Sequence, residues 1–97
     1  MLIPRLTGSF LRKFRAALGL SQTDMALLFG INQTSYLRWE KGTHPVPPGI
    51  HAEVEQLYRD FLSDVAALRR GHPIEADAPW REVAMFWAMQ SELEPNM

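Results

Sequence analysis

The stretch that decides the fold is Leu18–Gly42, LGLSQTDMALLFGINQTSYLRWEKG, in which two short helical patterns are separated by a glycine. Ser21 is placed to cap the first pattern. Asp24, three residues later, completes an arrangement like a capping box, in which the two residues bond each other's backbone N–H groups. Asn32 is placed to cap the second pattern. Gly30 tolerates the positive φ that a tight turn requires. The stretch therefore predicts two helices joined by a short turn.

The apolar residues of this stretch indicate how the two helices pack. Ala26 supplies the small side chain that a close helix crossing needs, and Ile31, after the turn glycine, is expected to anchor the turn in the core. The inner positions are expected to be Met25, Ala26 and Phe29 in the first helix and Tyr36 and Trp39 in the second. Once these are buried, the second helix presents an outer face of Gln33, Thr34, Leu37 and Arg38.

This outer face carries side chains suited to the major groove of DNA. Gln and Arg can make two hydrogen bonds each with the edges of adenine and guanine, and an exposed Leu37 would suit a thymine methyl group. A helix-turn-helix unit places its second helix in the major groove. We therefore predict that these four residues read DNA bases.

Three further helices are predicted outside this stretch. Thr7 is a candidate cap for a helix that starts at Ser9 and ends before Gly19, and its inner positions are Phe10, Leu11, Phe14 and Leu18. A proline-rich connector, Thr43–Gly49, leads to a long helix whose apolar residues recur at helical spacing from Ile50 to Leu68.

The last predicted helix is capped by Asp77, has Pro79 in its first turn and extends to about Leu93. No run of alternating apolar residues indicates a strand. The fold class expected is therefore all-α, with five helices. We expect residues 1–97 to form one domain, with a helix-turn-helix core in residues 7–44 and helices for packing and dimerisation in residues 49–94.

The last helix is apolar around most of its circumference. Such a helix is buried on two sides, and a domain of this size offers only one side from within itself. Trp and Met are enriched in protein interfaces. We therefore predict self-association through this helix; the alternative is a terminal helix wedged into a monomer core. The expected interface residues are Trp80, Val83, Phe86, Trp87 and Met89.

Charge is distributed unevenly, although the net charge of the chain is only −1. Residues 1–44 carry six basic and two acidic side chains, and residues 45–97 carry four basic and nine acidic ones. A basic half suggests a face for phosphate, whereas the alternative is chance scatter of surface charge. The composition, 46% hydrophobic and 22% charged, is that of a folded protein. Without a signal peptide or an apolar run of about 20 residues, we expect a cytoplasmic protein that does not engage membranes.

The residues Gly19–Gln22, Ala26, Gly30 and Glu40–Gly42 together resemble the helix-turn-helix of the lambda-repressor-like, or Xre-type, regulators. The resemblance covers residues 7 to 47 and implies a compact bundle of four or five helices, usually a dimer on palindromic DNA. The residues Trp39–Gly42, Val46 and Pro47 also resemble a smaller subgroup that includes anti-CRISPR-associated autorepressors and some antitoxins.

The resemblance also implies roles for single residues. Gln22 would bind phosphate from the start of the first helix of the motif, and Arg15 and Glu40 would form an ion pair that orients the second helix. Basic and polar residues after that helix are further candidates for phosphate contacts. The full set expected at the DNA backbone is Ser21, Gln22, Asn32, Ser35, Lys41, Thr43 and His44.

We therefore interpret the sequence as a homodimeric transcriptional regulator, a repressor of its own operon, that reads an inverted repeat with half-sites about one helical turn apart. The alternative is an antitoxin or interaction module whose acidic C-terminal half binds a partner protein. We expect no enzymatic activity, cofactor or metal. The sequence has no cysteine, its three histidines are scattered, and no clustered acid–base set is visible.

Overall fold

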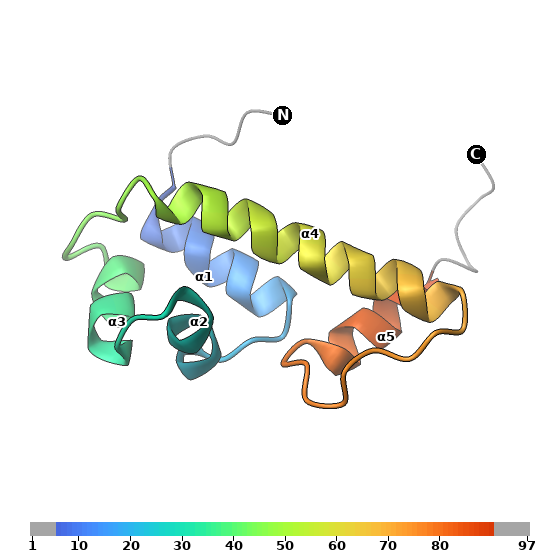
Figure 1. Cartoon of the computed structure of the whole chain (residues 1–97). Coiled ribbons are helices and arrows are strands. Elements are labelled where there is room, and N and C mark those ends of the chain that lie inside the picture. The colour runs from blue at the N-terminus through green and yellow to red at the C-terminus, as the bar shows by residue number, and fades with distance from the viewer. Residues whose placement is uncertain (1–5, 91–97) are drawn as a thin grey trace.

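The computed structural model describes residues 6–90, and within this range all regular structure is helical (Figure 1). The five helices are α1 (Gly8–Ala17), α2 (Gln22–Phe29), α3 (Gln33–Lys41), α4 (Ile50–Arg69) and α5 (Arg81–Gln90). The predicted all-α, five-helix class is confirmed. The expected end of the last helix near Leu93 lies outside the described residues.

The long helix α4 organises the arrangement. Helices α1, α2 and α3 gather near its N-terminal half, and α5 packs beside its C-terminal half (Figure 1). α3 contacts both α1 and α2, so it is supported from two sides. The helix-turn-helix and α5 therefore lie towards opposite ends of the same long helix.

The helix ends follow from residues identified in the sequence. The Thr7 hydroxyl accepts a hydrogen bond from the backbone N–H of Phe10 at 3.0 Å, which caps α1. Ser21 and Asp24 bond each other's backbone N–H at 3.0 and 2.9 Å, so the predicted capping box is present. Asn32 caps α3. Gly30 ends α2 with a φ of 70°, a left-handed conformation that Gly adopts without steric cost.

The core runs through both ends of the molecule. All five predicted inner positions of the helix-turn-helix are buried, and Phe29, Tyr36 and Trp39 form a cluster of rings with centroids 6.1 to 6.4 Å apart. Ile31 is partly buried and packs against this core. At the other end, Phe61 of α4 meets the rings of Trp80 and Trp87 edge to face, with centroids 5.8 and 4.9 Å apart. These contacts fix α5 on α4.

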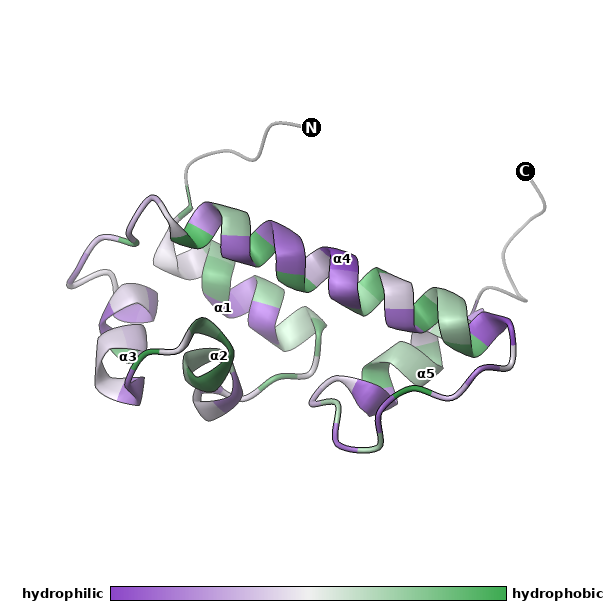
Figure 2. Ribbon diagram, viewed as in Figure 1, coloured by the Kyte–Doolittle hydropathy of each residue, from purple (hydrophilic) through white to green (hydrophobic). Residues whose placement is uncertain are grey.

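The two helices of the motif, α2 and α3, differ in hydropathy. Figure 2 shows part of α2 as strongly hydrophobic and its remainder as pale or purple, whereas α3 is mostly pale or purple. Part of the hydrophobic surface of α2 is not buried, because Leu27 is 73% exposed. α3 thus combines a buried inner side with a polar outer side.

Two glycines permit close contacts between elements. A Cβ on Gly8 would lie 2.0 Å from the carbonyl oxygen of Trp39 and 2.8 Å from that of Glu40. The start of α1 therefore rests directly on the backbone of α3. A Cβ on Gly19, after α1, would lie 2.5 Å from a methyl carbon of Val83, so α5 also touches the turn between α1 and α2.

Two expectations about α5 and α1 were wrong. The last helix begins at Arg81 and is not capped by Asp77, because Glu75–Trp80 forms turns in which the N–H of Ala78 bonds the carbonyl of Glu75 and the N–H of Arg81 bonds that of Ala78. Phe10, expected on the inner face of α1, is 37% exposed and stacks on Phe14 along the same helix.

Candidate nucleic-acid interface

The outer face of α3 presents three exposed polar side chains, Gln33, Thr34 and Arg38, which we call the recognition face. Leu37, expected to be exposed with them, is partly buried. Leu37 lies one turn beyond Gln33, whose side chain points to α2, so the edge of α3 that bears Leu37 is partly covered. The recognition face is accordingly more polar than the sequence suggested.

Gln33 is held by a contact that the sequence did not predict. The hydroxyl of Thr23, in the first turn of α2, lies 3.1 Å from the side-chain oxygen of Gln33 and donates a hydrogen bond to it. Both side chains are exposed. No spacing rule links these residues, which come together only because α2 and α3 cross.

The orientation of α3 is fixed by a polar cluster around Glu40. Arg15 of α1 donates to both carboxylate oxygens of Glu40, from Nε at 2.7 Å and from Nη2 at 3.1 Å, and its Nη1 donates to the carbonyl of Leu20 at 3.2 Å. The ion pair that the family resemblance implied is thus present. Gln22 of α2 donates to Glu40 at 3.2 Å, and the hydroxyl of Tyr36 also donates to it. One carboxylate therefore ties together α1, α2 and α3.

Glu40 is only 8% exposed, so its charge depends on these partners. Burial alone would raise the pKa of Glu40, but the hydrogen bonds from Arg15, Tyr36 and Gln22 outweigh it and hold the pKa below its usual value. The hydrogen bond to Glu40 raises the pKa of Arg15. Burial, followed by the bond to Glu40, raises the pKa of Tyr36. The cluster therefore stays as a carboxylate, a guanidinium and a neutral phenol at neutral pH.

This cluster engages one of the residues predicted to bind phosphate. Gln22 is partly buried, and its amide nitrogen donates to Glu40. This bond uses one of the two N–H donors of the amide, so the second donor is the one that a phosphate contact from Gln22 would use. The participation of Gln22 and Tyr36 was not predicted, because the sequence indicated only the pair of Arg15 and Glu40.

The other predicted phosphate residues lie at the starts of α2 and α3, within α3 and just after its end. Ser21 and Asn32 are exposed at the starts of α2 and α3 and use their side-chain oxygens as caps. Ser35 is partly buried, and Lys41 is exposed at the end of α3. The backbone N–H groups of Thr43 and His44 both bond the carbonyl of Arg38, at 3.1 and 3.3 Å, so the connector folds back onto the last turn of α3. The exposed side chains of Thr43 and His44 therefore lie close to that turn.

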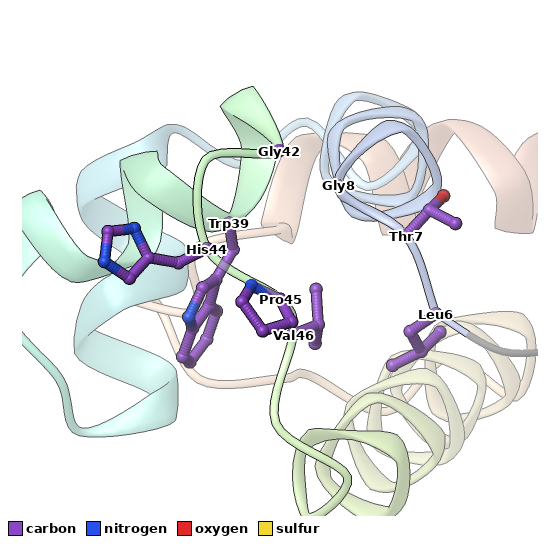
Figure 3. A pocket seen from close by; sticks show the side chains of 8 residues that line it. All are labelled: Leu6, Thr7, Gly8, Trp39, Gly42, His44, Pro45 and Val46. Carbon is purple, nitrogen blue, oxygen red and sulfur yellow. The ribbon is translucent and has the colours of Figure 1, made fainter.

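A shallow cavity of about 210 Å³ lies behind this connector (Figure 3). Its walls come from the start of α1, the end of α3 and the connector itself, namely Leu6, Thr7, Gly8, Trp39, Gly42, His44, Pro45 and Val46. Ligand pockets usually have volumes of about 300–1,000 Å³. This cavity is smaller than that range, so its size does not indicate a ligand site. It lies where the connector packs against the start of α1.

The residues predicted for the dimer interface divide into two groups. Trp80 is 6% exposed; its ring packs on Phe61, and its indole N–H donates to Asp64 at 2.8 Å, so Trp80 belongs to the core of the chain. Placing it on the interface was wrong, because it lies before the helix and points back to α4. Val83 and Trp87 are partly buried.

Phe86 and Met89, by contrast, are 56% and 67% exposed, and Met85 beside them is 42% exposed. We call these three residues the α5 outer face. Phe86 and Met89 belong to the predicted interface, whereas Met85 was not predicted.

Within residues 6–90, no helix is long and apolar enough to cross a membrane. The same range contains no group of three or more His, Cys, Asp or Glu side chains arranged to hold a metal ion.

Comparison with known proteins agrees with this geometry. Residues 11–50 match a family model described as helix-turn-helix. Over 73 residues, or 75% of its length, the chain is 29% identical to a protein of Thermococcus kodakarensis provisionally named as an HTH-type transcriptional regulatory protein. The chain spans 23% of the length of that relative. No solved structure matches the chain significantly. Residues 11–50 therefore form a helix-turn-helix domain similar to that of the lambda-repressor-like, or Xre-type, regulators.

Proposed function

We propose that this protein is a sequence-specific, double-stranded DNA-binding regulator of transcription that inserts α3 into the major groove. The observation that carries the proposal is the recognition face, whose polar side chains stand exposed on a helix held from two sides. The cluster around Glu40 fixes that helix relative to α1 and α2. A rigidly held helix is what base reading requires, because a bidentate contact tolerates little change in position.

The distribution of charge supports the same orientation. The basic half of the sequence, residues 1–44, contains α1, α2 and α3, whereas the acidic half contains α4 and α5. Attraction to phosphate would therefore turn the helix-turn-helix towards DNA and the C-terminal helices away from it. The side chains of Ser21, Asn32, Ser35, Lys41, Thr43 and His44 would then contact the backbone around the groove, and Gln22 would join them through the amide N–H that Glu40 does not use.

The test begins with selection of bound sequences from a random duplex library, followed by affinity measurements on the selected site and on unrelated DNA. Arg38→Ala should weaken binding to the selected site by about 1–3 kcal/mol per subunit and relax the choice of base at one position. Lys41→Ala should reduce the salt slope by about one with little change in base choice.

Arg70→Ala is the matched control for loss of positive charge. Arg70 is exposed at the end of α4, away from α3, and should leave base choice unchanged (Figure 1). An equal loss of affinity for all sequences in Arg38→Ala would contradict base reading by this residue.

We further propose that the protein acts in the cytoplasm as a homodimeric repressor, with residues 7–44 as its DNA-binding core and residues 49–94 supplying packing and dimerisation. A polar recognition face of three residues is small for specific binding by one subunit. A dimer bound to an inverted repeat would bring two such faces to the DNA. The α5 outer face supports the second part of this proposal, since it is apolar and its side chains are exposed in the described range, residues 6–90. Autorepression of its own operon would suit such a regulator.

Sedimentation would test this assembly. The double variant F86E/M89E should sediment as a monomer and lose affinity for a two-half-site operator more than for a single half-site. L27E, which changes an exposed leucine on α2, serves as the control for oligomeric state. Wild-type protein that sediments as a monomer would contradict the dimer. A different protein that co-purifies with the wild type and is lost with F86E/M89E would favour the antitoxin-like alternative, in which the C-terminal half binds a partner.

A further inference from the structure

We propose that Thr23, which does not belong to the recognition face, determines which base Gln33 reads, by holding the side-chain oxygen of Gln33 so that its amide nitrogen faces the DNA. The consequence is a preference for guanine over adenine at the position that Gln33 contacts. This inference rests on the proposed function and makes the expected base choice more specific.

The geometry of the contact supports this role. The Thr23 hydroxyl donates to the oxygen of Gln33 over 3.1 Å, from the first turn of α2 to the first residue of α3. A side-chain amide is planar, so a bond that fixes its oxygen also fixes the direction of its nitrogen. With the oxygen turned to α2, the two N–H donors form the end of Gln33 that points away from that helix.

The chemistry of the base edges then decides the preference. In the major groove, adenine presents one acceptor and one donor, whereas guanine presents two acceptors, N7 and O6. The usual contact of Gln with adenine uses the amide oxygen and the amide nitrogen together. Here the hydrogen bond from Thr23 turns the oxygen towards α2, so the amide nitrogen is the group of Gln33 that faces the base, and its N–H donors suit the two acceptors of guanine.

Gln22 does not compete for this role. It lies beside Thr23 at the start of α2, but its amide nitrogen donates to Glu40, on the inner side of α3. Thr23 is thus the residue from α2 that positions Gln33, and it acts on DNA only through Gln33.

The experiment measures dissociation constants for the selected site with guanine or adenine at the position that Gln33 reads. That position is identified as the one where Gln33→Ala removes the base preference. T23V keeps the shape of the side chain and removes the hydroxyl, while T23S keeps the hydroxyl. Losing one hydrogen bond should lower the guanine-to-adenine preference by about 3- to 10-fold in T23V, and T23S should retain the wild-type ratio. In the Q33A background, T23V should have no effect on the ratio.

Three results would overturn the inference while leaving the proposed function intact. The first is a wild-type preference for adenine at this position, and the second is an unchanged ratio in T23V. The third is a change caused by T23V in the Q33A background, because it would mean that Thr23 touches the base itself. Failure of the wild type to select any sequence would overturn the proposed function, and this inference with it. Circular dichroism of T23V, which changes an exposed residue, checks that the fold is retained.

Discussion

Replacing Glu40 with Ala should destabilise the protein more than any other single loss of a polar group in the described structure. The substitution removes the acceptor shared by Arg15, Gln22 and Tyr36. These donors belong to three different helices, so the loss is felt at the contacts of α3 with both α1 and α2. The expected effect is therefore on global stability and not on one helix end.

The magnitude follows from what each donor loses. A hydrogen bond to a charged group contributes about 1.5–3 kcal/mol, and breaking a buried ion pair by removing one partner costs about 3–5 kcal/mol. Arg15 retains 17% side-chain exposure, so water can replace part of its lost contact. We therefore expect a loss of about 3 kcal/mol. For a domain of this size, that corresponds to a melting temperature about 12–24 °C lower.

Urea unfolding followed by tryptophan fluorescence measures this loss directly. Trp39 lies beside the cluster, and Trp80 and Trp87 report on the other end of the molecule. Both regions should unfold together, with a lower midpoint and an unchanged m value. Y36F, which removes only one donor from Glu40, should cost about 1 kcal/mol.

The cost of Glu40→Ala should come from donors left without an acceptor and not from lost side-chain volume. The double variant R15M/E40M removes both charges and fills the space with apolar atoms, so it should be more stable than Glu40→Ala. A loss below about 1 kcal/mol in Glu40→Ala would refute the assignment of the cluster as the link between the three helices. If the double variant is less stable than Glu40→Ala, the cost does not come from leaving the charge of Arg15 without a partner.

Three further outcomes are expected. Gly8→Ala should destabilise by about 2 kcal/mol or more in urea unfolding, because its Cβ would meet the carbonyl oxygen of Trp39 at 2.0 Å, whereas Gly49→Ala, with nothing within 4 Å and a φ of −64°, should be close to neutral. The pKa of Glu40 is lower in the folded state, so its contribution to stability should be present above its ordinary pKa of 4.5 and be lost as pH falls through the lower folded value. The pH dependence of the unfolding midpoint measures this loss, which should be smaller in E40Q. The pKa of Tyr36 is raised in the folded state, so stability should also fall as pH rises above its ordinary value of 10.0, and Y36F should lack that decline.

The parts of the fold that sequence predicted well are those decided by neighbouring residues. The capping box of Ser21 and Asp24 joins residues three apart, and the cap at Asn32 acts within one turn. The left-handed conformation at Gly30 is a property of one residue. Such features depend on local geometry, so the boundaries of α2 and α3 followed directly from residue types.

The parts that sequence missed depend on which elements meet. Thr23 and Gln33 are ten residues apart, and Gln22 and Glu40 eighteen, so their contacts exist only after α2 and α3 cross. Trp80 shows a different limit: a Trp suits an interface and a core equally well by composition. Its bond to Asp64 and its contact with Phe61, both on α4, decide in favour of the core.

The separation of α3 from the α5 outer face has a consequence for the DNA site. α4 has 20 residues and is therefore about 30 Å long, with the helix-turn-helix near one end and α5 near the other (Figure 1). A dimer in which two antiparallel α4 helices lie side by side would hold the recognition faces about 30 Å apart, close to one turn of DNA, but it would set each α5 beside the helix-turn-helix of the partner and not against the partner's α5. A dimer formed through the two α5 outer faces would arrange the α4 helices end to end and hold the recognition faces about 60 Å apart, close to two turns. The spacing of half-sites in the operator, about 10 or about 21 base pairs, would therefore distinguish the two arrangements without a structure of the complex.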